Sequence, residues 1–258
     1  MTSWPSHQSA APAKGVPAVR RAAAILGLLA RQQRPMTLSQ IAQATSVLPG
    51  SCLPILRELA YARLLAFDSR HKTYRLGQGL AELANAVSRQ DPFAEAAALH
   101  LQEIADLYGM TATATAMCDA EHVACVALAQ SAVAMSLHVT LGGRVPLLAG
   151  AAGRCFAAYA GHPRPVLRRW FSKVRWQMAL GFEDWLSEVE QVRGRGWAQD
   201  CGTFSRGVTT LAIPVIAPDG SIRGVIGVGA ISAQLDERLK ARIVVTLQRA
   251  SADISAQL

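Results

Sequence analysis

The charge of this chain is strongly segregated along the sequence. The 258 residues carry a net charge of +8, and all of this excess lies in the first third. Residues 1–90 contain eleven basic and three acidic side chains, whereas residues 91–258 contain fifteen of each. A compact basic module attracts polyanions. We therefore predict a basic module followed by a neutral one, with a solvated basic surface that has no partner as the alternative.

Composition supports two folded modules. Apolar residues make up 51% of the chain and charged residues 17%, which excludes a disordered polyelectrolyte. No apolar run approaches the roughly 20 residues of a membrane span, so we expect no membrane contact. The five cysteines are dispersed and form no C-x-x-C motif, which favours a reducing cytoplasm. Residues 1–15 are expected to form a disordered tail.

Three helices are predicted at the start of the basic module. Apolar spacing indicates a helix over Pro17–Gln32. Thr37 and Gln40 have the spacing of a capping box for a short second helix. The third helix is expected from Ser51, as N-cap, to about Arg63. This register would place Pro54 in the first turn, where its missing N–H has no intrahelical partner to lose.

A basic hairpin follows the three helices. Residues 64–67 and 73–76 alternate as short strands around a polar turn. Three helices and such a hairpin form a winged helix-turn-helix, which we assign to residues 16–78. We assign residues 79–258 to a linker helix, whose pattern extends over about 77–90, followed by a second domain.

The second domain mixes strand and helix patterns without an internal repeat. Strands are expected at 111–118, 122–129, 135–141, 208–216 and 221–230, and helices at 93–108, 149–161, 164–173, 183–193 and 233–256. Hairpin strands with helices grouped between them indicate an α+β domain with an antiparallel sheet.

Several motifs resemble the IclR family of bacterial transcription regulators. They are Ile41–Leu59, the wing Phe67–Gly77 ending in Tyr-Arg-Leu-Gly, Leu141–Leu147, Ala152–Arg154 and the series from Gly196 to Gly220. The resemblance implies a winged helix-turn-helix, a linker helix and a GAF-like effector-binding domain. It further implies a dimer or tetramer on a palindromic double-stranded DNA operator. The implied effector is a small metabolite, usually a carboxylate or an aromatic.

The resemblance also identifies candidate DNA contacts. Family members usually carry Arg where this chain has Pro54, and Arg is the usual reader of guanine. Direct readout here must therefore depend on other side chains, with a larger share for phosphate contacts. The expected DNA-binding residues are Ser39, Gln40, Ser51, Cys52, Arg57, Arg70, His71, Lys72 and Arg75.

Carried over position by position, the resemblance also implies an effector pocket. Its expected residues are Leu137, Val145, Ala151, Ala152, Asp200, Val208, Thr210, Gly227 and Gly229, with Arg144 and Arg206 as rim candidates. Glycines in a strand allow close approach of a ligand. The helix that opens at Ala151 offers N–H groups to an anion. Asp200 is expected to receive a ligand hydroxyl or protonated group, with a solvated loop acid as the alternative. Its charge favours a monocarboxylate over a dicarboxylate.

Other motifs in the sequence give weaker indications of a functional site. Cys118, His122 and Cys125 suggest a metal, but no fourth ligand follows at zinc spacing, so buried structural thiols are expected instead. The glycines of 224–229 lack the strand–turn–helix setting of a nucleotide site. We predict no cofactor and no catalytic residue, because no nucleophile–base pair can be assembled. The alternatives are a sensor that no longer binds DNA and, third, an enzyme that uses the second domain's cavity.

Overall fold

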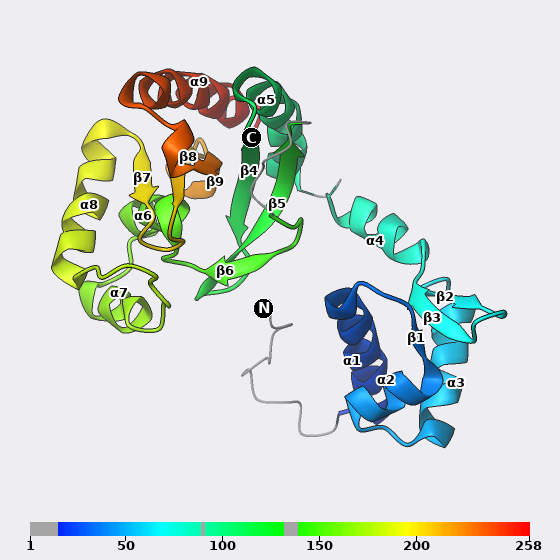
Figure 1. Ribbon diagram of the computed structural model, residues 1–258. Helices are drawn as coiled ribbons and strands as arrows, with labels where there is room; N and C mark the ends of the chain where they lie inside the picture. Colours follow the sequence, from blue (N-terminus) through cyan, green and yellow to red (C-terminus); the bar gives the residue numbers. More distant parts are fainter. Residues whose placement is uncertain (1–14, 89–90, 132–138) are drawn as a thin grey trace. The chain divides into compact units, whose positions relative to one another are not determined.

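The computed structural model describes residues 15–88, 91–131 and 139–258. The chain divides into two compact units, Met1–Val87 and Ser88–Leu258, which are described separately below (Figure 1). This division groups the linker helix with the first unit, whereas we had assigned it to the second domain. The expected tail lies almost wholly outside the described residues. Within the described ranges, no helix is both long and apolar enough to cross a membrane.

The first unit begins with three helices around a small core. They are α1 (Pro17–Gln32), α2 (Leu38–Thr45) and α3 (Pro49–Tyr61). The capping box of α2 is present, because Thr37 Oγ1 accepts from the Gln40 amide and Gln40 Oε1 accepts from the Thr37 amide. One apolar side chain from each helix is completely buried in the shared core: Ile25, Ile41 and Leu56.

The start of α3 differs from our expectation. The helix begins at Pro49, with Leu48 as N-cap, so Pro54 lies inside the helix rather than in its first turn. The helix can start three residues earlier than expected because a proline at the first helical position loses no hydrogen bond. Pro54 then leaves the Gly50 carbonyl without the amide donor four residues ahead.

A three-stranded sheet forms the wing. It contains β1 (Met36–Thr37), β2 (Leu65–Asp68) and β3 (Thr73–Leu76) in the order β1-β3-β2. The sequence pattern predicted the β2–β3 hairpin but not the two-residue strand β1. The linker helix α4 follows as Gly79–Ser88.

A six-stranded antiparallel sheet organises the second unit. Its order is β6-β5-β4-β9-β8-β7. The strands are β4 (Thr111–Met117), β5 (His122–Gln130), β6 (Arg144–Pro146), β7 (Ala198–Cys201), β8 (Val208–Ile216) and β9 (Ile222–Ile231). The neighbouring central strands β4 and β9 are far apart in the sequence. The sheet is therefore complete only when the first and last strands of the domain pair with each other.

Helices cover both faces of this sheet. One apolar core joins it to α5 (Pro92–Tyr108) and α9 (Glu237–Ser255), which lie together in Figure 1. A second core joins the opposite face to α6 (Gly150–Tyr159), α7 (Arg164–Phe171) and α8 (Phe182–Arg195). The α+β class is therefore confirmed.

Three details of the second unit were not predicted. The short strands β6 and β7 were missed, because strands of three and four residues leave little alternation to detect. The end of the expected strand at 135–141 is not strand, and its residues 135–138 lie outside the described part. The last helix starts later than expected, since a 3-10 turn at Ser232–Gln234 and the N-cap Asp236 precede α9.

Candidate functional site

Helix α3 presents an exposed stripe on the surface of the first unit. Gly50, Pro54, Arg57 and Tyr61 are all exposed and follow one another at helical spacing, with Ser51 beside them. Ser51 and Arg57 are thus accessible, as a DNA contact requires. Cys52 is not, because its side chain faces the core and is 0% exposed. Our expectation that Cys52 contacts DNA was therefore wrong.

The wing carries a compact set of exposed cations. Arg70, Lys72 and Arg75 are exposed, and so is His71, whose Nδ1 lies 2.8 Å from Asp68 Oδ2. Asp68 Oδ1 also accepts the amides of Arg70 and His71 at 2.8 and 3.2 Å. These hydrogen bonds, led by that from the His71 side chain, hold the pKa of Asp68 below its ordinary value. The carboxylate thereby orders the turn that presents the cations.

Ser39 and Gln40 lie at the exposed start of α2. The capping box uses Gln40 Oε1 and the Gln40 amide, and it does not use the Nε2 group. Gln40 Nε2 and the Ser39 hydroxyl can each donate to a phosphate oxygen.

The second candidate site is a row of residues across one face of the large sheet. Asp200, Thr210, Gly229 and Thr111 are register partners on β7, β8, β9 and β4. Directly opposed residues on antiparallel strands share a face. The structure thus brings three of the expected effector residues beside each other, and it adds Thr111. The Thr-Ala alternation at 111–116 was the signal that could have identified it.

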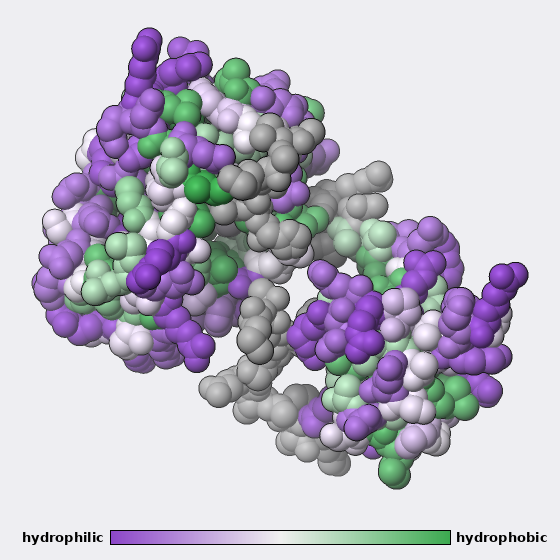
Figure 2. All heavy atoms as spheres, viewed as in Figure 1, coloured by the Kyte–Doolittle hydropathy of each residue, from purple (hydrophilic) through white to green (hydrophobic). Residues whose placement is uncertain are grey.

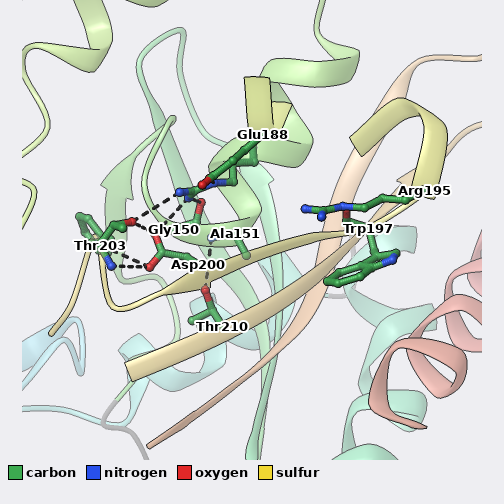
Figure 3. A network of polar contacts seen from close by, with 10 residues as sticks. Gly150, Ala151, Glu188, Arg195, Trp197, Asp200, Thr203 and Thr210 are labelled. Carbon is green, nitrogen blue, oxygen red and sulfur yellow. Dashed lines mark hydrogen bonds and ion pairs between the residues drawn. The ribbon is translucent and has the colours of Figure 1, made fainter. Parts of the chain in front are cut away.

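Helix α6 begins over this row. Its N-cap, Ala149, provides no side-chain hydrogen bond to the first turn. Instead the amide of Ala151 donates to Thr210 Oγ1 at 3.2 Å (Figure 3). Gly150 has φ +62°, a left-handed conformation that favours glycine. The site therefore combines a hydroxyl with a helix N-terminus, two groups that bind a carboxylate well.

Asp200 forms a buried ion pair with Arg154. Arg154 Nη1 lies 3.0 Å from Asp200 Oδ2, and its Nε lies 2.5 Å from Glu188 Oε2. Arg154 Nη1 also donates to the Gly150 carbonyl at 2.9 Å. Thr203 completes the network by donating to Asp200 from its amide, at 2.8 Å, and from its hydroxyl (Figure 3).

This network changes the role expected for Asp200. Its carboxylate oxygens already accept from Arg154 and Thr203, so it is not a free acceptor for a ligand hydroxyl. Sequence reasoning placed Arg154 within a family motif but missed its role. It also could not identify the partners, which lie 34 and 46 positions away.

The other expected effector residues fall into three groups. Val145 and Ala152 are half-buried against the core on the α6 side of the sheet. Val208 is also half-buried and Gly227 is buried on the same face. Leu137 lies outside the described residues. Gly227 has a structural reason to be glycine, because a Cβ there would clash with the Leu211 carbonyl oxygen.

The two rim candidates differ. Arg144 forms an ion pair with Asp119, so its charge is already neutralised. The Arg206 side chain is exposed, and its amide donates to Gln177 Oε1 at 2.9 Å.

The cysteines match a structural role only in part. Cys125 is buried, and burial raises the pKa of its thiol to about 11. Cys118 is exposed, contrary to our expectation, because it follows the last residue of β4. His122 Nδ1 lies 3.0 Å from Asp119 Oδ1. In the described part of the chain, no three His, Cys, Asp or Glu residues converge as a metal site would require.

Known proteins resemble this chain over nearly its full length. Residues 84–256 match the family described as "Bacterial transcriptional regulator IclR C-terminal", and residues 18–69 match "IclR helix-turn-helix domain". The Pca regulon regulatory protein of Pseudomonas putida is 26% identical over 248 residues, which cover 92% of this chain and 82% of that protein.

Solved structures of IclR regulators have the same fold as this chain. An IclR transcriptional regulator from Alicyclobacillus acidocaldarius is 26% identical, with TM-score 0.79 and coverage of 95% of this chain and 99% of that one. An IclR homolog from Microbacterium hydrocarbonoxydans, complexed with 4-hydroxybenzoate, has the same fold at 17% identity (TM-score 0.78, 93% and 98% covered). Together with the matched domains, these likenesses show that the chain belongs to the IclR family of DNA-binding bacterial transcriptional regulators.

Proposed function

We propose that a small monocarboxylate binds the second domain at the N-terminus of α6 and thereby modulates operator binding. The observation that carries this proposal is that the N-cap residue Ala149 makes no side-chain hydrogen bond to the helix start, and that the hydroxyl of Thr210 lies there and accepts from the Ala151 amide. A carboxylate oxygen there would meet backbone N–H groups and the positive end of the helix dipole. The complex of the Microbacterium homolog with 4-hydroxybenzoate supports the ligand class.

Charge limits the ligand to one carboxylate. Arg154 contacts both Asp200 and Glu188, and Glu188 also interacts with Arg195, so these two cations are already engaged by acidic partners. A second ligand carboxylate in this region would compete with Asp200 and Glu188 for them. Gly229, the register partner of both Thr210 and Thr111, has no side chain, which favours close approach of a ring to the strand beside Thr210.

The test is a thermal-shift panel of benzoate, 4-hydroxybenzoate, pyruvate, succinate and uncharged benzamide. Monocarboxylates should stabilise the protein, and Thr210→Val should reduce the shift. The matched control is Thr209→Val, which alters the neighbouring residue on the opposite face of β8. An equal loss of the shift in both variants, or equal stabilisation by benzamide, would contradict the proposal.

The first unit supplies the DNA contacts in this proposal. The expected surface comprises Ser39, Gln40, Ser51, Arg57 and the wing residues 70–72 and 75. We propose a homo-oligomer on a palindromic operator in the cytoplasm, because two-fold repeats of a recognition helix match two-fold repeats of sequence. A sensor without DNA binding would instead select no sequence from a random duplex library.

A further inference from the structure

The part of the recognition helix that would approach base edges is unusually poor in polar side chains. In helix-turn-helix proteins the N-terminal residues of this helix contact the bases. Here the exposed residues at that end are Leu48, Pro49, Gly50, Ser51 and Pro54. Only Ser51 has a side chain that can form a hydrogen bond.

The apolar groups in this segment project outward. Leu48, the N-cap of α3, is 77% exposed although its side chain is hydrocarbon. Pro54 is exposed one turn beyond Gly50 in the stripe that continues to Arg57. Neither Leu48 nor Pro54 belongs to the core of the first unit, to which α3 contributes Cys52, Leu56 and Leu59 instead. Figure 2 shows that exposed hydrophobic residues lie among hydrophilic ones on the visible surface of this unit.

Most of the positive charge of the first unit lies outside this apolar segment. Arg57 is the only described basic residue of α3, and Glu58 beside it balances its charge. The other exposed cations of the first unit include the wing residues, Arg34 between α1 and β1, Arg63 after α3, and Arg20, Arg21 and Arg31 on α1. Such cations attract the phosphate backbone but carry no sequence information.

We infer that Leu48 and Pro54 contact the C5-methyl groups of thymines in the major groove, so that this protein selects A·T pairs at the positions these two side chains approach. The inference rests on DNA binding by the first unit. The thymine methyl is the one major-groove feature that hydrocarbon side chains can contact favourably. Placed over a G·C pair, the same side chains would desolvate its polar edge without providing a partner.

The experiment begins with selection of binding sites by the full-length protein from a random 24-bp duplex library. Each thymine of the selected duplex is then replaced singly by deoxyuridine, which lacks only the methyl group. Burial of one methyl group predicts about a fourfold loss of affinity at each contacted thymine. Leu48→Ser and Pro54→Ser, which replace hydrocarbon by a hydroxyl, should each abolish the loss at their own thymine. The control variant is Leu99→Ser, whose leucine is also 77% exposed but lies on α5.

The outcomes separate this inference from DNA binding itself. Selection of no site would overturn both the inference and DNA binding. Selection of a site that binds equally well with deoxyuridine would overturn only the methyl readout. A deoxyuridine penalty that persists in both Leu48→Ser and Pro54→Ser would also overturn it, because other residues would then contact the methyls.

Discussion

Arg154 and Asp200 form an ion pair inside the second domain, with 3.0 Å between Nη1 and Oδ2 and exposed fractions of 1% and 3%. The pair ties α6 to β7. It lies beside Thr210, which is the register partner of Asp200. The candidate effector site is therefore built on a buried charge pair, whose loss should affect stability and ligand response together.

The first prediction concerns this pair. Arg154→Leu leaves Asp200 buried without a cation, which should lower the free energy of unfolding by about 3–5 kcal/mol. Asp200→Asn should cost less, because Arg154 retains Glu188 and the Asn side chain retains an acceptor for Thr203. Urea denaturation measures both. Arg164→Leu is the control, since it removes an exposed pair with Glu183 that contributes about 1 kcal/mol or less. Equal losses at positions 154 and 164 would contradict the argument.

The second prediction concerns the proline within α3. Removing an interior helix proline should raise the free energy of unfolding, by up to about 3 kcal/mol for Pro54→Ala. Pro49→Ala, at the first helical position, should change it little. Chemical denaturation of the two variants distinguishes the observed helix start from a start at Ser51. If Pro54→Ala does not raise the free energy of unfolding, a helix start at Ser51 is favoured instead.

The third prediction concerns Gly229. A leucine there would project toward Thr210 and Thr111, and we expect it to remove the thermal shift by monocarboxylates while DNA affinity without ligand changes less than about threefold. Gly227→Ala is unsuitable as a probe, because its Cβ would clash within the sheet and destabilise the fold. A ligand that stabilises wild type and Gly229→Leu equally binds elsewhere.

The fourth prediction concerns the salt dependence of DNA binding. Log K should fall linearly with log salt by about 0.9 for each phosphate contact. Arg70→Ala on the wing should reduce that slope by about 1. Fluorescence anisotropy over a salt series measures the slope. Arg175→Ala, an exposed cation of the second unit, should leave it unchanged. A slope that is the same in all three proteins would exclude Arg70 from the interface.

The fifth prediction concerns the thiols. Burial raises the pKa of Cys125 to about 11 and raises that of Cys155 as well, so both stay protonated at pH 8. Exposed Cys118 and Cys201 should be alkylated first, as mass spectrometry can show. Because the folded-state pKa of Cys125 exceeds its ordinary value of 9.0, folding stability should fall as pH rises from 9.0 toward about 11. Rapid labelling of Cys125 in the folded protein would contradict its burial.

Local features were predictable because they depend on neighbours in the chain. The capping box joins Thr37 to Gln40, three residues away, and the structure contains it. The helix Pro17–Gln32 and the strand Val208–Ile216 have the predicted ends, because their apolar periods are long. The α3 register failed where two prolines gave competing local signals, and a local rule cannot decide between them.

The sequence by itself thus determined the helices, the hairpins, the separate basic module and, through its motifs, the family. Tertiary structure alone decided which side chains share an environment. It buried Cys52, set Thr111 beside Gly229 on β9, and enclosed Arg154 between Glu188 and Asp200. The physical reason is that burial and charge compensation depend on strands and helices that meet in space, and spacing along the chain carries no information about those partners.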